Sequence, residues 1–392
     1  MAYSASSRFV LLCNSVALGL GAILLAFPIH LRAVDLDIPR LQVEAERGSI
    51  KEEVELGAAY FAGRGVPQDE KRAAYWYEKA ANAGDPGAQK QIGYFYDAGI
   101  GVKRDPAQAV RWYQRAVAGG LISAKVNLGV AFLLGVSVTK DPAMAEDLFR
   151  QAYAQGNGLA ACYLGEMHFR GIGVERDESA GERWYESGAK LHDPRAEFQL
   201  ANLLWRRQKN ESELKRAIKL LHESAGAGMV AAKHQLGVIL VKKPELAASA
   251  QEAPALLKEA AEAGEWRSSV ALGLLSRDGI GVPADPGTAY YHYRVAALQG
   301  GDDALRVVAS DLESIASRLG PEQVATIDGK AKAWFGDHHL ALQFINKDGG
   351  KWKEYPAYAV VNPEDGVHAG KLIPADPSAG YMGEPNRRLS AY

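Results

Sequence analysis

The sequence has few of the residues from which disulfides and metal sites are built. Only two cysteines occur in 392 residues, Cys13 in an apolar N-terminal segment and Cys162 inside a repeated segment, which argues against a disulfide between them. The adjacent His338 and His339 lack the i, i+4 spacing that places two metal ligands on one helical face. No neighbouring cysteine or acidic cluster completes a tetrahedral ligand set. We therefore expect no bound metal.

The sequence also lacks a glycine-rich phosphate loop with its lysine. Sequences such as Gly99-Ile100-Gly101 follow a predicted helix, whereas the glycines of a dinucleotide-binding fingerprint follow a strand. Aspartate and glutamate are plentiful, but they are distributed along the chain and no carboxylate pair stands out. The formal net charge of -2 gives no overall attraction for nucleic acid. We expect no catalytic residues, no cofactor and no nucleic-acid partner.

Charge is missing from most of the N-terminal segment. No charged side chain lies between Arg8 and Arg32, and residues 9–29 are almost wholly apolar. A membrane-spanning helix needs about 20 apolar residues, whereas a cleavable signal has an apolar core of about 7–15. The residues that follow the apolar run fit a signal-cleavage site poorly. We interpret residues 1–40 as a membrane anchor, with a cleaved signal and an ordinary buried helix as the alternatives.

A regular spacing of small residues runs through the middle of the chain. Residues at an interval of 36 form a ladder that is typical of repeat architectures. We interpret residues 49–300 as seven units, each a pair of short helices called A and B, in a solenoid domain that spans residues 41–300. The ladder consists of Gly57, Gly93, Gly129, Gly165, Ala201, Gly237 and Gly273.

The first unit shows the local pattern. Helix A is expected over residues 52–63, where apolar and small residues form one helical stripe and glycines follow. Helix B is expected over residues 70–83, with Asp69 as its cap and with Trp76 and Tyr77 on its buried face. The same order of signals returns in the later units.

A glycine inside helix A needs a reason, because it weakens a helix by about 0.8–1.0 kcal/mol relative to alanine. Repetition of this cost along the ladder implies that a bulky neighbour needs the space a Cβ would fill. We predict that small residues on helix A meet large aromatic residues on helix B. The substitution Gly129→Leu should therefore overpack this contact.

The second unit carries the repeat pattern in full. This pattern resembles the Sel-1-like repeat, a relative of the tetratricopeptide repeat with about 36 residues per unit. The resemblance covers residues 49–300 and implies an all-α fold, a right-handed α/α superhelical solenoid of helix-pair repeats. It also implies a scaffold or adaptor without catalysis, often in a bacterial envelope. The pattern is carried by Ala88, Gly93, Tyr96, Gly99, Gly101, Asp105, Trp112 and Tyr113.

Two functions follow from this resemblance and from the N-terminal segment. We expect a scaffold that binds protein partners on its concave surface, within a secretion or envelope assembly. It would be anchored in the bacterial inner membrane by residues 9–29 with a periplasmic solenoid, or be periplasmic or secreted after signal cleavage. The alternative is binding of a polysaccharide or cell-wall ligand in an exopolysaccharide system. A row of exposed Tyr or Trp on the inner face would favour the sugar, and a mixed polar and apolar groove would favour a protein.

The fifth and sixth units depart from the pattern. Both lose the glycines after helix A, and leucine pairs replace the paired aromatic residues of helix B. Their loops are basic, and the loops of a solenoid project from one edge. We take these side chains, called the basic patch, as candidate partner-binding residues; the alternative is a solvated loop that has drifted from the pattern. The basic patch consists of Trp205, Arg206, Arg207, Lys209, Lys242 and Lys243.

The pattern fades after residue 300. Residues 302–319 predict one more A-type helix, and Pro321 opens a second helix that continues to Trp334. We assign residues 301–336 to capping helices that cover the last apolar face of the solenoid. Residues 337–392 are rich in proline and glycine and lack helical periodicity, so we expect an extended or disordered tail.

Overall fold

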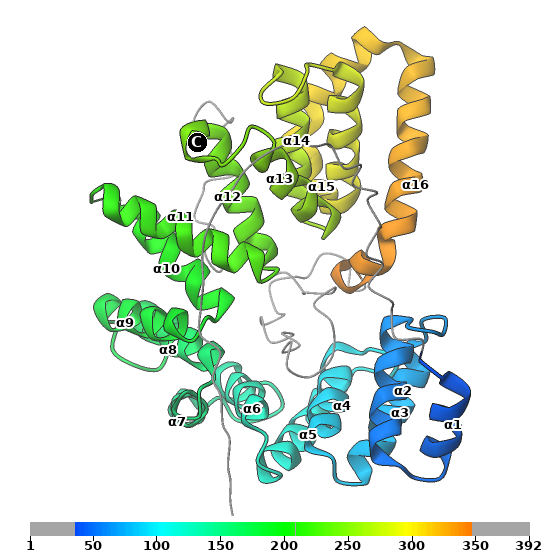
Figure 1. Ribbon diagram of the computed structural model, residues 1–392, viewed down its shortest axis with the longest axis vertical. Coiled ribbons are helices and arrows are strands. Elements are labelled where there is room, and N and C mark those ends of the chain that lie inside the picture. Colours follow the sequence, from blue (N-terminus) through cyan, green and yellow to red (C-terminus); the bar gives the residue numbers. More distant parts are fainter. Residues whose placement is uncertain (1–35, 208, 347–392) are drawn as a thin grey trace, which may run out of the picture.

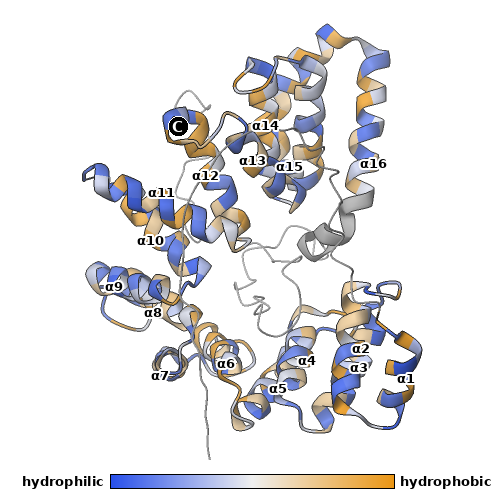
Figure 2. Ribbon diagram, in the orientation of Figure 1, coloured by the Kyte–Doolittle hydropathy of each residue, from blue (hydrophilic) through white to orange (hydrophobic). Residues whose placement is uncertain are grey.

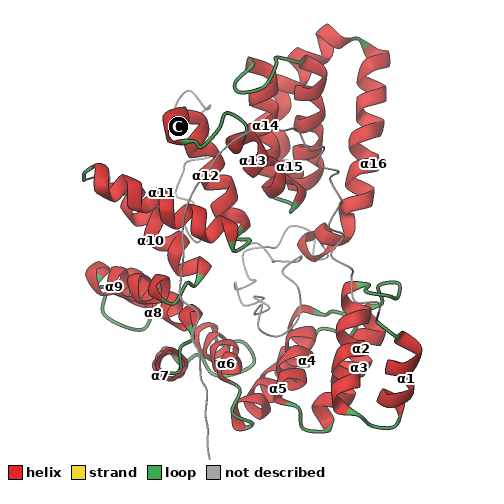
Figure 3. Ribbon diagram, viewed as in Figure 1, coloured by secondary structure: helices red, strands yellow, loops and turns green. Residues whose placement is uncertain are grey.

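The chain is described by a computed structural model over residues 36–207 and 209–346, with side chains up to residue 336. Every regular element in this part of the chain is a helix (Figure 3). The elements are α1 (Ile38–Glu46), α2 (Ile50–Ala62), α3 (Glu70–Asn82), α4 (Pro86–Ala98), α5 (Pro106–Ala118), α6 (Ile122–Leu134), α7 (Pro142–Ala154), α8 (Gly158–Arg170), α9 (Glu178–Lys190), α10 (Pro194–Arg207), α11 (Glu211–Gly226), α12 (Val230–Lys242), the short 3-10 helix η1 (Pro244–Leu246), α13 (Glu252–Glu262), α14 (Trp266–Asp278), α15 (Pro286–Leu319) and α16 (Pro321–Asn346).

The helices are arranged as a solenoid. Contacts join mainly neighbouring helices along the chain, as each repeat in such an array touches only the next. The even-numbered helices from α2 to α14 are the A helices, and the odd-numbered helices from α3 to α13, with the first part of α15, are the B helices. The array curves so that α4, α6 and α8 lie on its inner side and α5, α7 and α9 on its outer side (Figure 1). The all-α solenoid predicted from the sequence is confirmed.

The core runs along the array. Hydrophilic and hydrophobic residues alternate along each helix, because one side is buried and the other meets solvent (Figure 2). One buried cluster extends from Cys162 in α8 through Tyr185 and Leu221 to Leu240 in α12. Successive units therefore share their core, and no unit buries its apolar face alone.

The ladder glycines touch the rings of helix B, as predicted. A Cβ on Gly129 would lie 2.7 Å from the ring of Phe149, and one on Gly93 would lie 2.8 Å from the ring of Tyr113. In unit six the same contact is made to a leucine, since a Cβ on Gly237 would lie 2.7 Å from Leu257. Glycine is therefore required by packing. The remaining pairs are Gly57 with Tyr77, Gly165 with Tyr185, and Gly273 with Tyr293.

The predicted helix ends are also observed. Five A helices end at a glycine in the left-handed conformation, which lacks the Cβ that disfavours this backbone shape. Five B helices start at an aspartate whose carboxylate accepts a backbone N–H of the first turn. The glycines are Gly63, Gly99, Gly135, Gly171 and Gly279, and the aspartates are Asp69, Asp105, Asp141, Asp177 and Asp285.

Helix α1 is an element that the sequence analysis did not foresee. It begins at Ile38, inside the segment assigned to the anchor, and is capped by the Asp37 carboxylate. Its apolar side packs on the first unit, where Leu41 and Ala45 are buried. The ammonium of Lys79 on α3 donates to the Ala45 carbonyl at 2.6 Å. Helix α1 therefore occupies the position that helix B of a preceding unit would take, and it covers the end of the array.

The C-terminal cap is longer than predicted. Helix α15 contains a break at Gly301, with φ 56° and ψ -137°, so the expected helix over residues 302–319 is a separate segment. Helix α16 begins at Pro321, as predicted, but continues past Trp334 to Asn346. Residues 337–346, assigned to the tail, are therefore helical, because no residue there stops a helix as proline or a left-handed glycine would.

The predicted anchor at residues 9–29 and most of the tail, residues 347–392, lie outside the described residues. Among the helices that are described, none is long and apolar enough to cross a membrane.

Candidate partner-binding surface

The basic patch lies where α10 and α12 end. Neither helix is closed by a left-handed glycine; α12 passes through Lys243 at φ -130° into the short helix η1. Residue 208 lies between the described parts of the chain, and α11 starts after the cap Asn210. The connections of units five and six therefore differ from those of the regular units.

Arg207 has a structural position within the patch. Its guanidinium makes two hydrogen bonds of 3.0 and 3.1 Å to the carboxylate of Glu182 on α9. It also contacts Glu213 on α11, with distances of 3.2 and 3.0 Å. A planar guanidinium suits such paired contacts. Arg207 thus joins three helices, and the two carboxylates balance its charge.

Arg206 and Lys242 occupy equivalent positions at the ends of consecutive A helices, 36 residues apart. Both residues are exposed. The equivalent residue of the preceding unit is Arg170, also exposed, whose guanidinium pairs with Glu166 one turn earlier on α8. Partial burial lowers the pKa of Lys242. We call Arg170, Arg206 and Lys242 the basic row; Arg170 was missed in the sequence, although its offset from Arg206 was visible there.

The remaining patch residues are divided between core and surface. Trp205 is half-buried against the shared core of units four to six. Lys209 is exposed, and its backbone N–H donates to Glu213 at 3.2 Å. Lys243 is half-buried beside η1. The structure therefore brings Arg206 and Lys242 into one row, while Trp205 and Arg207 hold the units together.

Aromatic side chains on the A helices are buried or half-buried throughout the described chain. Within the described residues, the one exposed aromatic side chain is Tyr75, which is 58% exposed on the B helix α3. A row of flat, exposed rings for stacking on a sugar is therefore missing from the described A helices. At the equivalent position near the end of each A helix, units one to three have Ala62, Ala98 and Leu134, units four to six have the basic row, and unit seven has Asp278.

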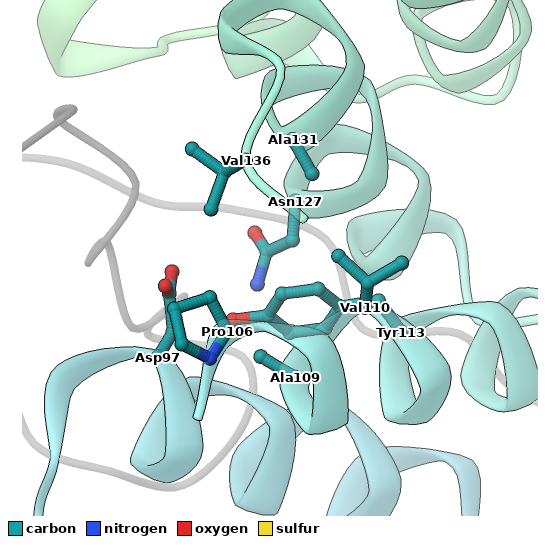
Figure 4. A pocket seen from close by; sticks show the side chains of 8 residues that line it. All are labelled: Asp97, Pro106, Ala109, Val110, Tyr113, Asn127, Ala131 and Val136. Carbon is teal, nitrogen blue, oxygen red and sulfur yellow. The ribbon is translucent and has the colours of Figure 1, made fainter. Parts of the chain in front are cut away.

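A hollow between units two and three is too small for a ligand. It is lined by residues of α5 and α6 and by Asp97 of α4, with the side chains of Tyr113 and Asn127 pointing towards one another (Figure 4). Its volume is about 10 Å³, room for about one water molecule. Burial raises the pKa of Asp97 to about 6.

A serine and a histidine meet at the joint between units six and seven. The Nδ1 atom of His234 lies 2.8 Å from the Oγ atom of Ser268, as a nucleophile and its base would. Both residues are buried, Ser268 completely, so no substrate reaches the hydroxyl. Burial lowers the pKa of His234. This pair therefore acts as a polar link between units. No group of three or more potential metal ligands occurs in the described part of the chain.

The comparison with known protein families gives one match for each of five repeat units. The model of the Sel1 repeat matches residues 53–85, 86–121, 122–157, 158–193 and 267–301. These matches cover units one to four and unit seven. The unmatched residues 194–266 are the two units that carry Arg206 and Lys242. No curated protein matches this chain.

Several solved structures are similar to this chain. A Sel1 repeat protein from Oxalobacter formigenes is 27% identical, with a TM-score of 0.52 over 63% of this chain and 98% of that one. A protective antigen of uropathogenic Escherichia coli with an SLR fold is 23% identical, with a TM-score of 0.41 over 79% of this chain and 74% of that one. An immunity protein from Pseudomonas aeruginosa is 21% identical, with a TM-score of 0.36 over 48% of this chain and 74% of that one.

Proposed function

Because the chain belongs to the Sel1 repeat family, whose members are generally protein-interaction scaffolds, we propose that it is a non-catalytic scaffold that binds a partner protein at units five and six. One observation carries this proposal. The two units that depart from the repeat are also the units that place Arg206 and Lys242 at equivalent, exposed positions.

The chemistry of the basic row indicates the kind of partner. The three cations occupy equivalent positions on successive A helices, so they follow one another along the array. A partner segment with acidic side chains at matching intervals would be attracted to the basic row. Such attraction raises the association rate and is weakened by salt.

We extend the proposal to the cell envelope. The apolar residues 9–29 would hold the protein at a bacterial inner membrane, with the solenoid on the periplasmic side and within an envelope or secretion assembly. Removal of the segment as a signal would instead leave a periplasmic or secreted protein. Sequencing the N-terminus of the mature protein distinguishes the two outcomes.

A crosslinking pull-down from membranes tests the scaffold function. The double variant Arg206→Gln/Lys242→Gln should recover the partner at least about tenfold less well than the unchanged chain, since each lost charge contact contributes about 1 kcal/mol or more. The matched control is Lys215→Gln/Lys258→Gln, which removes the same charge from the exposed sides of the B helices α11 and α13 in units five and six. This control should recover the partner normally.

The same experiment includes a labelled glycan and a form lacking residues 337–392. Recovery of no partner from either form, together with binding of the glycan, would reject the scaffold function. Equal loss in both double variants would mean that total charge, and not the basic row, governs binding.

A further inference from the structure

One pair of positions links the helices inside a unit. A residue in the first turns of helix A faces a residue near the end of helix B, and in three units the two side chains attract one another. Two of these contacts are ion pairs, and the third is a hydrogen bond between an ammonium and an amide. The pairs are Glu53 with Lys79 at 2.9 Å, Lys125 with Gln151 at 3.1 Å, and Lys233 with Glu259 at 2.7 Å.

Unit five has two carboxyl groups in this place. Glu197 of α10 is equivalent to Glu53, and Glu223 of α11 is equivalent to Lys79, each at an offset of 144 residues. Glu197 is only 2% exposed. Glu223 is half-buried and pairs with Lys219 at 3.5 Å. Two ionised carboxylates in this position repel one another, so a complementary pair has become a conflicting one.

His192 lies beside this pair in a strained conformation. Its φ is 55°, a left-handed value that is unfavourable for a side chain with a Cβ. The Nδ1 atom of His192 lies 3.6 Å from the Oε1 atom of Glu197. The equivalent positions of other units are glycines with positive φ, namely Gly48, Gly84, Gly120, Gly156, Gly228 and Gly264.

The other charged groups around Glu197 have different contacts. Asp193, ahead of α10, accepts the backbone N–H groups of Arg195 and Ala196 as a helix cap. The Arg195 guanidinium donates to the Tyr163 hydroxyl at 3.4 Å. On α8, which also packs on α10, Glu166 pairs with Arg170.

We propose that Glu197 and Glu223 make the joint between units four and five a pH-sensitive switch, closed when Glu197 is protonated and loosened when both carboxyl groups are ionised. Burial, and after it the negative charge of Glu223, raise the pKa of Glu197 to about 7. The switch therefore operates near neutral pH. This inference is independent of the proposed partner.

The sign of the pH effect follows from the raised pKa. The neutral form of Glu197 stabilises the fold fully below pH of about 4.5, and this contribution is lost as the pH rises through about 7. Replacing the acid by a neutral isostere should keep the joint closed at all pH values. Arg206 of the basic row lies on the same helix as Glu197, so the joint also sets where this cation is held.

The test compares unfolding of the full chain at pH 5.5 and pH 8 in urea. For Glu197→Gln we expect the ratio of folded to unfolded protein to rise over that of the unchanged chain at both pH values, and at least about tenfold more at pH 8 than at pH 5.5, because pH 5.5 already lies above the pKa of the unfolded acid. The matched variant Glu53→Gln removes an equally buried acid that faces Lys79, and should lower stability at pH 8. An identical pH profile for Glu197→Gln and the unchanged chain overturns the proposal.

Hydrogen exchange provides a second readout. After correction for the intrinsic exchange rate, amides of α9 to α11 should lose protection between pH 5.5 and pH 8, while those of α4 to α6 should not. Glu223→Gln should reduce this loss, because it removes the repelling charge from the other helix. Uniform loss along the whole array, or no effect of Glu223→Gln, contradicts a local switch.

Discussion

At the scale of single residues, the packing of helix B on helix A depends on positions where a Cβ would have no room. The ladder glycines allow helix B to approach until its ring touches the backbone of helix A. This was predictable, because a destabilising residue repeated at a fixed interval needs a packing reason. The two carboxyl groups of unit five were not foreseen, because the sequence does not show which positions of helices A and B face one another.

The first prediction concerns the ladder. Gly129→Leu should lower the free energy of unfolding by about 1–3 kcal/mol or more, because its side chain would collide with the Phe149 ring. The control is Gly226→Ala in α11, where an added Cβ meets nothing within 4 Å. This change should raise stability by about 0.5–1 kcal/mol. Thermal melts followed by circular dichroism measure both, and an unchanged melt for Gly129→Leu would contradict the packing scheme.

The second prediction concerns a left-handed residue. Ser137 has φ 55° at a loop position where other units have glycines, such as Gly101 with φ 64°. Ser137→Gly should stabilise the protein by about 0.5–1 kcal/mol, because relief of strain exceeds the entropy gained by the unfolded chain. The reverse change, Gly101→Ser, should destabilise it strongly, since a Cβ there would lie 2.0 Å from the Glu70 carbonyl oxygen. Urea titrations of both variants should move in opposite directions.

At the scale of elements, helix starts were predicted better than the ends of the array. An aspartate followed by proline, as at Asp105 and Asp141, fixes where a helix begins. Helix α1 was missed because it lacks the repeat pattern and stands beside the apolar N-terminal segment. The predicted end of helix α16 was too early, because residues 337–346 were judged together with the proline- and glycine-rich residues that follow them.

The third prediction separates the joint from the binding surface within the basic patch. Arg207→Gln should lower stability by about 1 kcal/mol, because it removes contacts with Glu182 and Glu213 that connect three helices. The loss should shrink in high salt, where partly exposed ion pairs are screened. Arg206→Gln should lower stability less than Arg207→Gln does, because the Arg207 guanidinium connects three helices. Equal losses in both variants would show that Arg206 also has a structural role.

At the scale of the whole molecule, the interval of 36 residues determines the solenoid, and the departures from it locate the candidate site. The sequence identified the two irregular units, but it could not separate Arg206 from Arg207. The ion pair between Arg207 and Glu182 joins residues 25 positions apart, in contact only because of how α9 packs on α10. The division of the patch into a joint and a basic row therefore required the structure.

Position-specific photo-crosslinking in membranes tests the central claim, that the partner binds at units five and six. A photoreactive residue at position 206 or 242 should give the same crosslinked partner, and one at position 75, exposed on the outer helix α3, should give none. High salt should weaken the adducts at 206 and 242. A partner crosslinked at 75 and absent at 206 and 242 would contradict the account.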